Sequence, residues 1–62
     1  MKLSAYLKKK RISQVDFARQ LGVEREAVAR WIAGIRRPRR ETAQKIVQIT
    51  GPRGVTFEDI YG

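Results

Sequence analysis

The fold is decided by QVDFARQLGVEREAVARWIA, residues 14–33. Apolar residues recur at helical spacing on both sides of Gly22, and only Val23 and Glu24 separate the two runs. Two helices joined by so short a connection cannot lie antiparallel, so they must cross at a steep angle. The crossing requires a small residue where the backbones approach, which is Ala18, and a residue free to take positive φ, which is Gly22. The stretch therefore predicts two steeply crossed helices around a tight turn.

Local signals mark the ends of these two helices. Ser13 precedes the first helix as an N-cap, and Asp16 three residues later makes a variant of the capping box. The second helix is predicted over residues 25–33, and Gly34 stops it. The apolar stripe expected to be buried on the second helix consists of Val28, Trp31 and Ile32.

Helical spacing of apolar residues also occurs before and after this motif. The positions are Leu3, Tyr6 and Leu7 on one side, and Ala43, Ile46, Val47 and Thr50, followed by Gly51, on the other. Near the end, Thr56 with Asp59 three residues later predicts a capped one-turn helix that buries Val55 and Ile60. No segment alternates with period two. We therefore predict an all-α fold, four short helices plus a C-terminal helical turn, in a single domain over residues 1–62.

Composition restricts the function to binding. The 62 residues carry a formal charge of +8 and include neither cysteine nor histidine. The chain therefore lacks disulfides, thiolate zinc ligands, a thiol nucleophile and the usual general base. Glu24 and Glu26, at positions i and i+2, do not share a helix face. We expect no enzyme activity, no metal, no cofactor and no small-molecule ligand.

The charge and the apolar pattern also bear on the partner. No apolar run approaches the roughly 20 residues that span a bilayer, and MKLSAYLKKKR places its apolar residues before its lysines, the reverse of a secretory signal. We therefore expect a cytoplasmic protein without membrane contact. The excess positive charge points to a polyanion. A membrane-active cationic peptide would spread its charge evenly, whereas residues 54–62 carry two acids and no base.

The two crossed helices together resemble the helix-turn-helix of the phage Cro and repressor group, the XRE-type regulators. The matching residues are Gln14, Ala18, Gly22, Val23, Val28 and Trp31. The resemblance extends from Leu3 to about Ile60 and is closest to small phage Cro proteins. It implies a lambda-repressor-like domain that represses transcription by occluding an operator in duplex DNA, at the nucleoid of a bacterial or phage-infected cell. The alternative is an antitoxin-type interaction protein that binds a toxin and regulates its own operon.

The resemblance also implies which residues contact DNA. In this family the second helix of the motif enters the major groove, and the positions that face base edges are here Arg25, Glu26, Ala29 and Arg30. Arginine can pair with guanine, glutamate can accept from cytosine, and alanine can contact a thymine methyl. The phosphate contacts expected are Gln14 at the start of the first helix and, within GIRRPRR at residues 34–40, Arg36, Arg37 and Arg39. The alternatives are a solvated basic face and an ion pair of Glu26 with Arg30 at i, i+4.

Two helix-cap positions depart from the family pattern. Glu24 and Arg39 stand where the family usually has a Ser or Thr helix cap.

A single recognition helix reads too few base pairs to single out an operator. We therefore expect a weak homodimer that is completed on a pseudo-palindromic site, held by apolar side chains after residue 46. Phe57 and Tyr61 either pack locally or belong to that contact.

Overall fold

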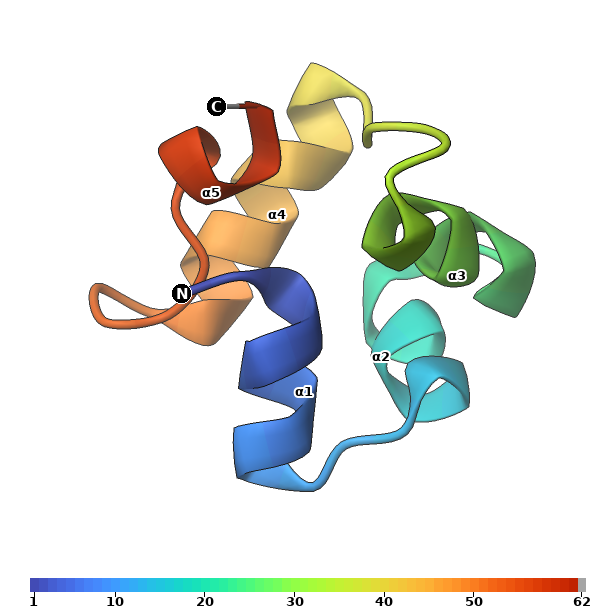
Figure 1. Cartoon of the computed structure of the whole chain (residues 1–62), viewed down its shortest axis with the longest axis horizontal. Helices are drawn as coiled ribbons and strands as arrows, with labels where there is room; N and C mark the ends of the chain where they lie inside the picture. Colours follow the sequence, from blue (N-terminus) through green and yellow to red (C-terminus); the bar gives the residue numbers. More distant parts are fainter. Residues whose placement is uncertain (62) are drawn as a thin grey trace.

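Five helices make up residues 1–61, the part of the chain that the computed structural model describes. They are α1 (Leu3–Lys10), α2 (Gln14–Leu21), α3 (Arg25–Ala33), α4 (Arg40–Thr50) and α5 (Phe57–Tyr61). No strand occurs in this range, so the all-α prediction is confirmed. In Figure 1, α2, α3 and the connection to α4 occupy one side of the molecule, and α1, α4 and α5 occupy the other. None of the helices within residues 1–61 is long and apolar enough to cross a bilayer.

The first three helices end in the same way. Each is followed by a residue in the left-handed region: Arg11 (φ 55°), Gly22 (φ 73°) and Gly34 (φ 77°). The N–H of the next residue returns to a carbonyl five positions earlier, as in a Schellman motif. These bonds are Ile12 to Leu7 at 2.9 Å, Val23 to Ala18 at 3.0 Å and Ile35 to Arg30 at 3.0 Å. The repeated motif turns the chain sharply, and after α2 it leads into α3 with only Val23 and Glu24 between Gly22 and the next helix, as predicted.

The core is formed by residues of α1, α2, α3 and α4 together with Val55, which precedes α5. Its most deeply buried side chains are Phe17, Val28, Ile46 and Val55. Ala18 is also buried, as expected for the small residue at the α2–α3 crossing. Trp31, Ile32 and Ile60 were expected to be buried but are only partly so, and they pack against the edge of the core. They remain partly accessible because they line a hollow between α3 and α5.

The C-terminal segment is fixed by polar contacts. The Thr56 N–H donates to Asp59 Oδ2 at 2.9 Å and the Asp59 N–H donates to Thr56 Oγ1 at 3.1 Å, which completes the predicted capping box. The Met1 amino group donates to the same Asp59 Oδ2 at 2.8 Å and to the Gly54 carbonyl at 2.9 Å. These bonds join the start of the chain to the start of α5.

Candidate nucleic-acid interface

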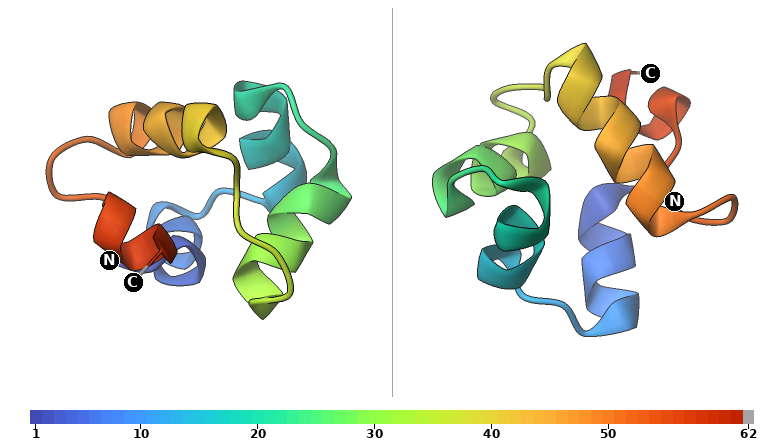
Figure 2. Two further views of the ribbon diagram at one scale, coloured as in Figure 1. Left: turned by 90° about the horizontal axis from the view of Figure 1, so that it is seen from above. Right: turned by 180° about the vertical axis from the view of Figure 1, so that it is seen from behind.

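Helix α3 has one buried face and one open face. Val28 is 0 % exposed and anchors the helix in the core. The four residues predicted to contact bases, Arg25, Glu26, Ala29 and Arg30, do not belong to the core; three are exposed and Ala29 is partly exposed. Figures 1 and 2 show α3 at the edge of the molecule, where no other helix covers its outer side. The structure therefore brings these four positions together on an accessible surface.

The charged side chains on α3 are only weakly held. Arg25 Nη2 lies 3.5 Å from Glu26 Oε1, and both side chains are more than half exposed, at 55 % and 56 %. The expected alternative, a Glu26–Arg30 ion pair, does not form within the described residues. An exposed pair at this distance contributes little to stability, because water screens it and both side chains lose freedom. Arg25, Glu26 and Arg30 are therefore free to rearrange on a partner.

The helix starts on this side of the molecule differ in their caps. Ser13 Oγ accepts the Asp16 N–H at 3.1 Å, which caps α2 as predicted. Glu24 before α3 and Arg39 before α4 form no side-chain cap, so the two departures from the usual pattern are also seen in the structure. Gln14, predicted to contact phosphate, is the first residue of α2 and is partly buried. The first N–H groups of a helix have no partner within it and favour anions.

The loop of residues 34–39 leaves α3 in a fixed conformation. The N–H groups of Ile35 and Arg36 both donate to the Arg30 carbonyl, at 3.0 and 3.4 Å. At the other end Pro38 is buried, and its carbonyl accepts the Tyr61 hydroxyl at 2.8 Å. Because its two ends are tied, the loop exposes side chains while its backbone stays in place. The predicted phosphate contacts on this loop, all exposed, are Arg36, Arg37 and Arg39.

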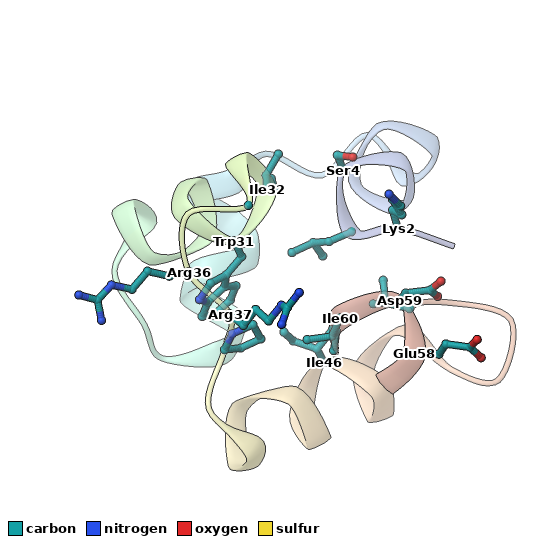
Figure 3. A pocket seen from close by; sticks show the side chains of 14 residues that line it. Lys2, Ser4, Trp31, Ile32, Arg36, Arg37, Ile46, Glu58, Asp59 and Ile60 are labelled. Carbon is teal, nitrogen blue, oxygen red and sulfur yellow. The ribbon is translucent and has the colours of Figure 1, made fainter. Parts of the chain in front are cut away.

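The arginines of the loop point in different directions. A hollow of about 370 Å³ lies between the start of α1, the end of α3, the loop and α5. Figure 3 shows Arg37 extending over this hollow toward Ile60, whereas Arg36 points away from it into solvent. Arg36 is therefore already directed outward, and Arg37 must swing out of the hollow to reach a partner on the outer side.

The sequence did not reveal the bond that anchors the loop. Tyr61 and Pro38 are 23 positions apart, and neither residue type signals the other. Only the packing of α5 beside the loop brings the hydroxyl to the carbonyl. For Tyr61 the sequence allows local packing or a dimer contact, and the structure shows a hydrogen bond within the chain for its hydroxyl.

The surface formed by α3 and the loop is strongly basic. Residues 25–39 include five arginines and a single acid, Glu26. A family model described as helix-turn-helix matches residues 3–55, which is most of the chain. No curated protein and no solved structure gives a significant match. Together with the crossed α2 and α3, the family match shows that the chain belongs to the XRE-type helix-turn-helix family of DNA-binding regulators.

Proposed function

We propose that the protein is a sequence-specific regulator of transcription, a Cro-like repressor that occludes an operator in duplex DNA. The observation that carries the proposal is the open face of α3 beside a basic loop whose backbone is already fixed. A rigid helix directed at the major groove can read base edges, and a fixed loop next to it can hold the backbone. The role is binding rather than catalysis, and duplex DNA as the partner places the protein at the nucleoid, in the cytoplasm.

Base reading falls to the open face of α3. Arg25 and Arg30 are exposed and long enough to bind guanine O6 and N7 in a bidentate manner. Glu26 would leave its exposed contact with Arg25 and accept a hydrogen bond from cytosine N4. Ala29, between them on this face, suits a thymine methyl group. Each bidentate arginine–guanine pair discriminates against the wrong base pair by about 1–3 kcal/mol.

Phosphate binding falls to residues on either side of α3. Gln14 at the start of α2 and Arg36, Arg37 and Arg39 on the loop would hold the backbone on the two edges of the groove. Contacts of this kind fix the position of the protein without reading sequence. Arg36 needs the least rearrangement, since its side chain already extends away from the hollow (Figure 3).

A second copy of the chain would complete the operator contact. Phe57 and Tyr61 are large apolar residues that remain 42 % and 38 % exposed on α5. Phe57 lies between two shallow hollows: Arg40, Gln44 and Tyr61 line one with it, and Glu41, Gln44, Lys45, Val47 and Gln48 line the other. We propose this α4–α5 surface as the contact between copies. Two recognition helices would then meet half-sites about 34 Å apart, one turn of the duplex.

The experiment that tests the function begins with selection of bound sequences from a random duplex pool. The expected result is a pseudo-palindromic site. Arg30→Ala should relax the preference at one or two positions, and Arg30→Lys, which keeps the charge but loses bidentate geometry, should do the same with little change in non-specific affinity. Failure of the pool to converge on any sequence would overturn the proposal of an operator-specific regulator.

The dimer is tested on the selected site itself. Inserting about five base pairs between the half-sites turns one recognition helix to the opposite face of the duplex and should reduce affinity to that of a single half-site. Inserting about ten should restore part of it. Equal affinity of the wild-type protein for one half-site and for the full site would refute the dimer.

A further inference from the structure

The apolar residue that follows α3 behaves differently from its two counterparts. In the Schellman motifs after α1 and α2, the residue past the left-handed position is Ile12 or Val23, and both pack against the core. An apolar contact from this position back onto the helix is a usual part of the motif. After α3 the same position holds Ile35, which is 73 % exposed. The backbone motif is repeated, but its apolar side chain points into solvent.

Nothing within the described chain makes use of Ile35 as an apolar residue. It is the most exposed of the large hydrophobic residues in residues 1–61, well above Ile49 at 42 %. The Ile35 N–H donates to the Arg30 carbonyl, and this bond holds the backbone from which the side chain extends. Isolated apolar residues on a surface are common. This one, however, occupies a position where the same chain twice places its apolar side chain against the core.

The charges around Ile35 indicate what would cover it. Arg30 precedes it on the open face of α3, and Arg36, which follows directly, points outward (Figure 3). A stable protein interface buries about 800 Å² per partner around an apolar centre, so a single exposed isoleucine suits a protein partner poorly. A DNA backbone presents phosphates separated by deoxyribose rings, whose C–H surface is apolar. Arg36, which the proposed function assigns to a phosphate, and Ile35 directly before it in the chain match a phosphate and the sugar next to it.

We infer that Ile35 is a DNA contact that packs on the deoxyribose rings at the edge of the groove entered by α3. The inference rests on the proposed DNA-binding function and adds to it a residue that reads no base and carries no charge. Covering an exposed isoleucine removes apolar surface from water, which strengthens binding without releasing counterions. Ile35 would therefore contribute to affinity on any duplex and leave the salt dependence unchanged.

The test compares Ile35→Ala with Ile49→Ala, the same truncation at an exposed position on α4. Binding is measured by fluorescence anisotropy on the selected operator and on an unrelated duplex, over a series of salt concentrations. Ile35→Ala is expected to weaken binding to both duplexes by about three- to tenfold, with an unchanged salt slope. Ile49→Ala, on the helix that carries part of the proposed dimer surface, should bind a duplex with a single half-site as the wild type does, whereas Ile35→Ala should be weakened on this duplex too. Both variants should keep the wild-type melting temperature, because neither side chain is in the core.

Three results would overturn the inference, and each would give Ile35 a different role. Wild-type affinity of Ile35→Ala for both duplexes would show that the side chain does not touch DNA. If Ile35→Ala and the wild type bind equally well to an operator in which uracil replaces thymine, Ile35 contacts a thymine methyl group and not a sugar. A loss of self-association of free Ile35→Ala, seen by sedimentation, would assign it to a contact between copies. If the wild type binds no duplex at all, the proposed function itself fails.

Discussion

The salt dependence of DNA binding follows from the arginines on the loop. In the proposed complex, the exposed Arg36, Arg37 and Arg39 would make three phosphate contacts per chain, hence six for a dimer. A complex that neutralises about six phosphates should show a slope of about −5.4 for log K against log salt, a loss of about 10³ in affinity between about 50 and about 200 mM. Arg36→Ala removes two of these contacts per dimer. The slope should then be about −3.6, and the loss over the same range on the order of 10².

The assay is a titration of a labelled operator duplex, followed by anisotropy at constant pH in a series of potassium chloride concentrations. The matched control is Arg53→Ala, which removes the same charge from the exposed turn between α4 and α5. That turn lies on the side of the molecule away from α3 (Figures 1 and 2). Arg53→Ala should keep the wild-type slope. Equal changes for Arg36→Ala and Arg53→Ala would show that net charge matters and the loop does not, which refutes the assignment of phosphate contacts.

Two further predictions concern stability. Gly22→Ala should lower the free energy of unfolding by about 1–2 kcal/mol, because φ is 73° there. Arg11→Gly, at the equivalent position after α1 (φ 55°), should raise the free energy of unfolding by up to about 1 kcal/mol. Urea denaturation measures both, and a loss of stability in Arg11→Gly would contradict the argument. Hydrogen bonding from the Met1 amino group is the main cause that lowers the pKa of Asp59 from 3.8 to about 2. A lowered carboxyl pKa stabilises the fold above about pH 4, and this contribution is lost as the pH falls toward 2. The stability difference between wild type and Asp59→Asn, followed by thermal melting, should therefore shrink over that range, while Glu58→Gln serves as the control; a difference independent of pH would contradict the pairing.

The helices could be predicted from the sequence because their signals are local. Ser13 caps α2 through a bond to a residue three positions away, and Gly22 and Gly34 take positive φ at the ends of α2 and α3. Such features depend on a few neighbouring residues and need no knowledge of the rest of the fold. The burial of Val28 also followed from spacing alone, since helical periodicity identifies the inward face.

The features that the sequence did not predict depend on contacts between distant segments. The Tyr61–Pro38 bond and the contact of the Met1 amino group with Asp59 arise only when α5 packs beside the loop and the start of α1. The partial exposure of Trp31 has the same origin, because the hollow that it lines is formed by four separate segments. The candidate DNA-contacting positions came from resemblance to a family, and the structure adds their accessibility.

The division of α3 into a buried face and an open face has a consequence for evolution. Val28 on the buried face supports the core, while Arg25, Glu26 and Arg30 on the open face contact almost nothing within the described chain. Substitutions at such exposed positions usually change stability by no more than about 0.5 kcal/mol. Selection can therefore exchange these side chains while the fold is conserved, and under the proposed function the preferred operator changes with them. A gene duplicate of this protein could acquire a new target through a few neutral steps on one helix face.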